Sequence, residues 1–213
     1  MSKNKKLLLI YVFTLTIFPL ILSGILNVIP VITEERGLVF VNLSVYAILM
    51  LSICRLYGKE IKEDLKKEKI AGQVIKYGMG CWLVGIVTAR IADLFAAETA
   101  GNQQIVDEIV VSDWILSMMI FGLFGPIVEE IIFRYIIMGK IYTYGKVRAI
   151  LVSSVLFGIL HMFRISMAEF LIYFISGIYL GVVYDKTKRI SVCIGAHCFH
   201  NLISILLSVL LLN

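Results

Sequence analysis

The chain has 213 residues, of which 60% are hydrophobic and 16% are charged, and its formal net charge is +5. Soluble domains carry about 45–50% apolar and about 25% charged residues, so this composition excludes an ordinary soluble domain and indicates an integral membrane protein. The basic residues fall in clusters between apolar runs, which excludes a nucleic-acid partner and indicates contact with a lipid bilayer.

Seven apolar runs are each long enough to cross a bilayer as a helix, which needs at least about 17 residues. In chain order they are Leu7–Ile32, Leu38–Tyr57, Ala71–Ala97, Ser112–Met138, Val147–Phe163, Met167–Tyr184 and Ile190–Leu212. Gly125 and Pro126 can divide the fourth run into two helical pieces. The sequence therefore predicts an all-α, polytopic membrane protein with about seven to eight transmembrane helices.

The connecting segments alternate in charge along the chain. The N-terminal MSKNKK and the segment KEIKEDLKKEK are rich in lysine, whereas AETAGNQQIVDE contains neither lysine nor arginine. Basic segments face the cytoplasm, so we expect a cytoplasmic N-terminus, in the cell membrane if the chain is bacterial. The first apolar run is longer than the core of a signal peptide, so we expect it to remain as the first span. We interpret KEIKEDLKKEK as a solvated or interfacial helix.

Three late runs carry polar side chains that a lipid environment disfavours. They are Glu129, Glu130 and Arg134 in EEIIFR, Phe157 and His161 in FGILH, and His197, His200 and Asn201 in HCFHN. Glu129, His161, His197 and Asn201 each lie about 12–20 Å along a helix from the nearest cytoplasmic basic residue, given the rise per residue. Because the hydrocarbon core is about 30 Å thick, all four are predicted near the middle of the membrane. The active site is therefore expected to be buried among the late helices.

The spacing of these residues indicates how they face one another. Glu130 and Arg134 are four residues apart with the acid first, the favourable order for a helical ion pair. Glu129 then leaves the helix in another direction and is free to face a cavity. His197 and Asn201 are also four residues apart and share a helix face.

This set of side chains suits the hydrolysis of a peptide bond. Glu129 and His161 can draw a proton from a shared water molecule and make that water nucleophilic. His197 and Asn201 can donate hydrogen bonds to the oxyanion of a tetrahedral intermediate. Phe157 lies one turn before His161 and would form a wall of the same cavity. No covalent enzyme intermediate is needed.

The ordered motifs EExxxR, FxxxH and HxxxN resemble those of the CPBP family of intramembrane proteases. This family includes type 2 CAAX prenyl endopeptidases and the bacteriocin-processing and self-immunity proteins called the Abi group. The resemblance covers 112–213, which we expect to form a catalytic helical core. Residues 1–111 carry no motif and are expected to add transmembrane helices to the same membrane domain.

The resemblance implies a role for each matched position. Glu129 would be the general base, His161 would help to activate the water, and His197 and Asn201 would line the oxyanion site. The supporting residues would be Glu130, Arg134 and Phe157, with Arg134 also able to touch the substrate. His200 lies outside the family pattern, and the motifs assign it no role.

The sequence leaves the cofactor open between two alternatives. The motif HExxH, which places two histidines over zinc, is absent from the sequence. We therefore expect no required cofactor. The alternative is a metalloprotease in which Glu129, His161 and His197 bind a divalent metal such as zinc and leave one position open.

Three functional hypotheses follow from these residues. The leading one is an intramembrane endopeptidase that acts on a membrane-associated peptide or protein, in bacteriocin processing or in self-immunity, with or without a membrane-protein partner. The second is a non-enzymatic immunity or scaffold protein that binds a peptide or a partner membrane protein. The third is a small proton-coupled transporter that uses the buried acids as a relay. The sequence shows no internal repeat, which argues against the transporter.

Overall fold

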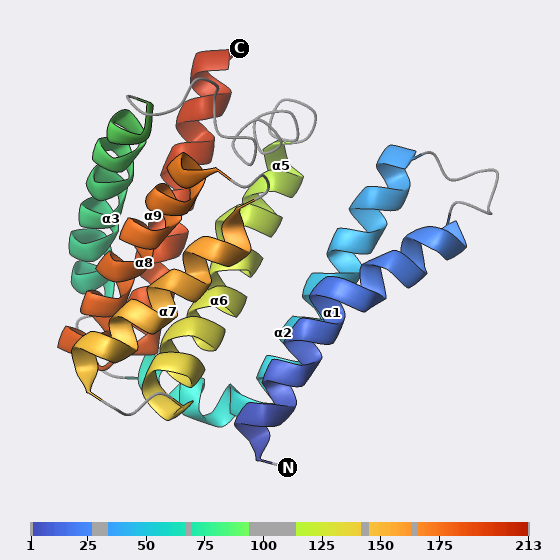
Figure 1. Ribbon diagram of the computed structural model, residues 1–213, viewed down its shortest axis with the longest axis horizontal. Helices are drawn as coiled ribbons and strands as arrows, with labels where there is room; N and C mark the ends of the chain where they lie inside the picture. Colours follow the sequence, from blue (N-terminus) through green and yellow to red (C-terminus); the bar gives the residue numbers. More distant parts are fainter. Residues whose placement is uncertain are drawn as a thin grey trace. The chain divides into compact units, whose positions relative to one another are not determined.

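The computed structural model describes residues 2–26, 34–66, 70–93, 114–141, 145–162 and 166–212 of the chain. Every regular element in these ranges is a helix, as Figure 1 shows. The predicted all-α class is therefore confirmed for the part of the chain that the structure describes.

Most helices follow the predicted apolar runs. The helices are α1 (Lys3–Leu26), α2 (Glu34–Leu65), α3 (Ile70–Asp93), α5 (Trp114–Ser117), η1 (Met118–Phe124), α6 (Gly125–Glu130), η2 (Ile131–Ile141), α7 (Lys146–His161), α8 (Met167–Thr187) and α9 (Ile190–Leu212). Helix α2 begins before the predicted start at Leu38 and continues past the predicted end at Tyr57. The predicted ends of the first, third and fifth runs, at Ile32, Ala97 and Phe163, lie outside the described residues.

Five helices in the described part are long and apolar enough to cross a membrane: Val41–Leu65, Ile70–Ala92, Trp114–Ile141, Met167–Thr187 and Ile190–Leu210. A polytopic helical membrane protein is thereby confirmed. Helix α7 has 16 residues and is shorter than these five. The full number of seven to eight spans stays a prediction.

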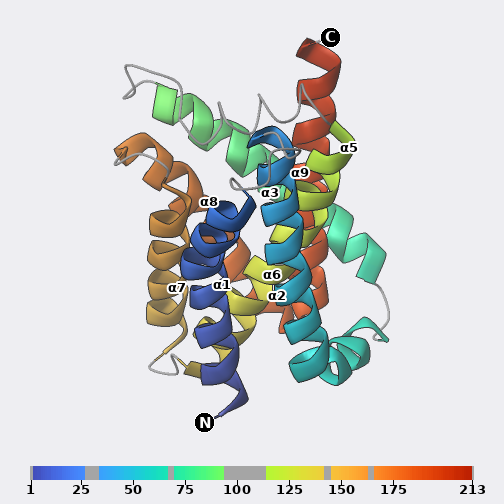
Figure 2. The same ribbon diagram turned by 90° about the vertical axis from the view of Figure 1, so that its right-hand side faces the viewer.

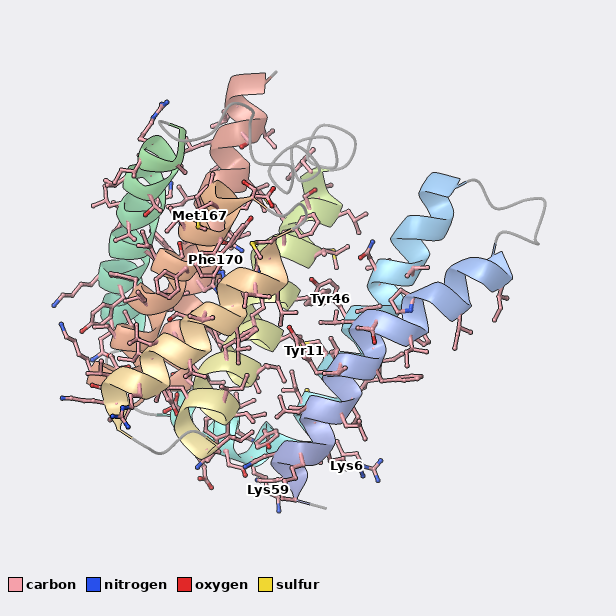
Figure 3. The ribbon with its side chains drawn as sticks, in the orientation of Figure 1. Lys6, Tyr11, Tyr46, Lys59, Met167 and Phe170 are labelled. Atoms are coloured by element: carbon pink, nitrogen blue, oxygen red, sulfur yellow. The ribbon has the colours of Figure 1, made fainter. Side chains whose placement is uncertain are left out.

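The chain divides into two compact units, 1–62 and 63–213. In the first unit, α1 and α2 are antiparallel, and the start of α1 contacts the end of α2. The hydroxyl of Tyr57 donates a 2.5 Å hydrogen bond to Oδ1 of Asn4, and Lys3 pairs with Glu60. Lys6 and Lys59 lie at the same end of this helix pair (Figure 3). The predicted boundary at 111/112 separates sequence without motifs from sequence with them and stays a prediction.

The second unit holds all three motifs in one bundle. Helix α3 packs on α8 and α9, α7 packs on α8, and α9 lies beside η1 and α6 in both views (Figures 1 and 2). Small residues permit close approach between α7 and α8. Phe170, labelled in Figure 3, lies against Gly158, where an added Cβ would be 3.0 Å from its ring. At Gly177 an added Cβ would lie 3.1 Å from Ser154.

Helix α9 is anchored at its first turn by Asp64 from the end of α2. Oδ2 of Asp64 accepts a 2.8 Å hydrogen bond from the backbone N–H of Ser191. Nη2 of Arg189 donates a 3.2 Å hydrogen bond to the backbone carbonyl of Asp64. The interpretation of KEIKEDLKKEK as a helix is confirmed as far as Leu65, where α2 ends. A buried acid at its end caps the helix that carries His197.

The helix from Trp114 to Ile141 is continuous, so its predicted division at Gly125 and Pro126 is wrong. The hydrogen-bonding pattern of the helix changes along this segment, but the helix does not break. The stretches η1 and η2 are π-helical, with hydrogen bonds between residues five apart, and α6 lies between them. Such stretches are rare and often occur at functional sites. The two adjacent glutamates end α6.

Candidate active site

Three helices bring Glu129, His161 and His197 together. Oε1 of Glu129 lies 3.6 Å from Nε2 of His161, and Oε2 lies 3.8 Å from Nε2 of His197. The side chains of Glu129 and His161 keep 18% and 21% of their surface exposed. The residues predicted to converge from separate motifs therefore do meet.

Both imidazoles present the same ring nitrogen to Glu129. Nδ1 of His161 lies 2.8 Å from the backbone carbonyl of Phe157, and Nδ1 of His197 lies 2.9 Å from Oε1 of Glu130. A carbonyl and a carboxylate only accept, so each Nδ1 carries a proton and donates it. In the neutral rings Nε2 is then an acceptor that faces Glu129. Such partners fix the tautomer and the orientation of each ring.

Glu130 is the centre of a fully buried polar cluster. Its Oε1 lies 3.1 Å from Nη1 of Arg134, and neither side chain has any exposed surface. Nη2 of Arg134 donates a 3.2 Å hydrogen bond to the backbone carbonyl of Gly177 in α8. Its guanidinium carbon also lies 4.5 Å from the centre of the Phe157 ring, a cation–π contact. The predicted ion pair is therefore present, and it also reaches α7 and α8.

His161 lies between two aromatic rings. The ring centre of Phe157 is 4.2 Å from that of His161, and Tyr173 of α8 stacks on the same imidazole at 4.6 Å and 25°. Sequence reasoning placed Phe157 at the cavity but missed Tyr173. The tyrosine follows no motif spacing, and only the packing of α8 on α7 brings it there.

Asn201 makes a contact that the sequence did not predict. Its Nδ2 donates a 2.7 Å hydrogen bond to the backbone carbonyl of Phe121 in η1. A carboxamide nitrogen has two N–H groups, so one remains for another acceptor. The predicted part of Asn201 in an oxyanion site stays a prediction.

The remaining histidine lies apart from this cluster. His200 packs against α3, where a Cβ added to Gly85 would be 2.7 Å from Cε1 of the imidazole. It belongs to the interface between α3 and α9 and not to the group around Glu129.

A metal centre needs several side chains that point at one position. Within the residues that the structure describes, no group of three or more His, Cys, Asp and Glu side chains is arranged to hold a metal ion. Metal binding by Glu129, His161 and His197 stays a prediction.

Comparisons with known proteins agree with the motifs. Residues 111–203 match the family described as "Type II CAAX prenyl endopeptidase Rce1-like". "Putative membrane peptidase YdiL" of Bacillus subtilis is 32% identical over 162 residues, which are 72% of this chain and 64% of that protein. "Membrane-embedded CAAX protease MroQ" of Staphylococcus aureus is 24% identical over 183 residues, 78% of this chain and 72% of that protein.

An "Uncharacterized protein" of Mycoplasma capricolum is 27% identical over 156 residues, 70% of this chain and 46% of that protein. The chain thus spans less than two thirds of the Bacillus and Mycoplasma proteins. No solved structure matches it. The resemblance predicted from the three motifs is nevertheless confirmed: residues 111–203 of this chain match the Rce1-like family of type II CAAX prenyl endopeptidases.

Proposed function

We propose that this chain is an intramembrane endopeptidase that hydrolyses a peptide bond in a membrane-associated peptide or protein. The single observation that carries the proposal is the approach of two imidazoles from α7 and α9 to the Glu129 carboxylate, at 3.6 and 3.8 Å. The names of the Bacillus and Staphylococcus relatives, "Putative membrane peptidase YdiL" and "Membrane-embedded CAAX protease MroQ", support the same reaction class.

In the proposed reaction Glu129 and His161 act on one water molecule. The water donates hydrogen bonds to the Glu129 carboxylate and to Nε2 of His161, both of which are acceptors. As the water oxygen bonds to the peptide carbonyl carbon, Glu129 takes the proton. It then returns this proton to the leaving nitrogen, and the C–N bond breaks.

His197 and Asn201 are proposed to stabilise the oxyanion. Asn201 has one N–H left after its bond to Phe121, and His197 can donate from Nε2 only when its ring is protonated. Donors held in place before the reaction are worth about 2.7–4 kcal/mol of transition-state stabilisation.

We propose that the reaction requires no metal, since Glu129 and His161 already supply two proton acceptors at the site. The resemblance implies one of two biological roles, the processing of a bacteriocin-type or other peptide, or self-immunity. We further propose that the chain acts with a membrane-protein partner. A lipid bilayer is the environment of the reaction.

The test compares membranes that contain wild type, Glu129→Ala or no protein. New peptide N-termini are identified by mass spectrometry, and a synthetic peptide that spans one such site is then given to the purified proteins in lipid vesicles. The proposal expects cleavage by wild type alone. Equal cleavage by Glu129→Ala would remove the catalytic assignment. If the Glu129→Gln and His161→Ala variants still protect cells fully against a peptide toxin, that result would instead favour a non-enzymatic immunity protein.

A further inference from the structure

The carbonyl of Phe121 has no backbone donor in the register of η1. The N–H of Gly125 bonds to the carbonyl of Ile120, five residues earlier. In the same register the carbonyl of Phe121 would accept from residue 126, which is a proline and has no N–H. The winding therefore leaves one peptide oxygen without a backbone partner inside the bundle.

Asn201 supplies the missing donor. Its Nδ2 lies 2.7 Å from the carbonyl oxygen of Phe121, a short hydrogen bond. Gly122 allows α9 to come this close, because a Cβ there would lie 2.6 Å from Cδ2 of Leu202. An unpaired carbonyl in an apolar interior destabilises the folded state, so this bond has a physical reason that does not involve a substrate.

The same proline explains the π winding itself. In an α-helix the ring of Pro126 would clash with the carbonyl four residues earlier, that of Gly122. The wider turn of η1 avoids this clash. It also changes the direction in which every later side chain leaves the helix axis, and Glu129 is three residues after Pro126.

We infer that Asn201 and Pro126 are a coupled pair of positioning residues that set the direction of Glu129. The proline forces the wide turn, and the asparagine side chain replaces the N–H that the proline lacks. The pair thereby holds η1 in the winding that aims Glu129 at His161 and His197. The catalytic part of this inference rests on the proposed function, whereas the coupling between the two residues does not.

The experiment is a double-mutant cycle with Pro126→Ala and Asn201→Ala, read by thermal unfolding of the purified full chain in detergent. Pro126→Ala restores an N–H that can bond to the Phe121 carbonyl. Asn201→Ala should therefore lower the Tm by several degrees in wild type, and by less than about half as much in the Pro126→Ala background. Pro126→Ser, which also restores the N–H, replaces Pro126→Ala if that variant does not fold.

A matched control is Pro19→Ala, which removes the proline inside α1. It restores an N–H far along the sequence from Phe121, so the fall in Tm caused by Asn201→Ala should be unchanged in that background. Equal falls in the wild-type, Pro126→Ala and Pro19→Ala backgrounds would overturn the inference.

The kinetic readout separates positioning from a purely structural bond. With the peptide identified above, Asn201→Ala should lower kcat with little change in KM. Pro126→Ala should also lower kcat, because the wide turn is no longer forced, and Asn201→Ala should then lower kcat by a smaller factor in the Pro126→Ala background than in wild type. A side chain that acts only on the oxyanion would lose the same kcat in both backgrounds, and that result would overturn the positioning role. If wild type cleaves nothing, the proposed function fails, whereas the Tm cycle still decides the coupling.

Discussion

One carboxylate oxygen of Glu130 serves both His197 and Arg134. It accepts a 2.9 Å hydrogen bond from Nδ1 of His197 and lies 3.1 Å from Nη1 of the guanidinium. The second acid of the EE pair thus links a buried cation on its own helix to an imidazole on α9. This arrangement explains why two adjacent acids occur in an apolar helix: Glu129 faces the site, and Glu130 holds a side chain of that site in place.

Glu130→Gln should strongly destabilise the fold. The variant leaves Arg134, which has no exposed surface, without its counter-charge. Breaking a buried ion pair on one side costs about 3–5 kcal/mol. Thermal or denaturant unfolding in detergent measures this loss.

The matched control for this change is Glu60→Gln, which removes the acid of the exposed Lys3–Glu60 pair in the first unit. Exposed pairs contribute about 0–1 kcal/mol, so this variant should unfold almost like wild type. Equal losses from the two substitutions would show that the Glu130 pair is not buried as described.

Tyr173 should matter through the ring that stacks on His161. Tyr173→Phe keeps the ring that stacks on His161, whereas Tyr173→Ala removes it. Aromatic pairs contribute about 0.5–1.5 kcal/mol, so we expect Tyr173→Ala to lower kcat by roughly 2- to 12-fold and Tyr173→Phe, which keeps the ring, to lower it less. Cleavage of the identified peptide measures both.

Phe174→Ala on the same helix is the control, because Phe174 stacks on Phe170, an aromatic pair separate from the one around His161. Its kcat should stay near that of wild type. A loss as large as that of Tyr173→Ala would assign the effect to general packing of α8.

Much of the helical framework could be predicted from the apolar runs alone. The predicted ends Ile190 and Leu212 agree with α9, and Met167 is the observed start of α8. The ion pair of Glu130 and Arg134 could also be predicted, because four-residue spacing on one helix is a local property. Even the meeting of His161 with Glu129 followed from estimated depths.

Features that depend on contacts between helices could not be predicted. Hydropathy contains no signal for the π winding, which follows from Pro126 together with a donor from α9. Nor does local spacing show that Asp64 would cap α9, since its partner is 127 positions away. Tyr173 reaches His161 only because α8 packs against α7.

Asp64→Ala should loosen the start of α9. The change removes the acceptor for the N–H of Ser191 at the first turn of this helix. Loss of such a cap costs about 0.5–2 kcal/mol, which unfolding experiments in detergent can resolve. Glu63→Ala is the control, because Glu63 directly precedes Asp64 in α2 and its side chain is exposed. A similar loss of unfolding free energy in Glu63→Ala would contradict the capping role of Asp64.

Removal of divalent metals should leave cleavage unchanged. The proposed reaction uses Glu129 and His161 as proton acceptors and routes no step through a metal. Activity should therefore persist after incubation with EDTA or 1,10-phenanthroline and extensive dialysis. Loss of activity that zinc alone restores would instead establish the three-ligand metal alternative.

The most direct test of the account is a single-turnover assay in ¹⁸O-labelled water, with wild type and Glu129→Gln in the same lipid vesicles. For wild type we predict one ¹⁸O atom in the new C-terminal carboxylate, and no hydroxamate when hydroxylamine is added. Glu129→Gln keeps the shape of the side chain but cannot take the proton, so its rate should fall by about 10²–10⁴-fold. An undiminished rate in Glu129→Gln, or a hydroxamate product that reveals an acyl-enzyme, would contradict the account.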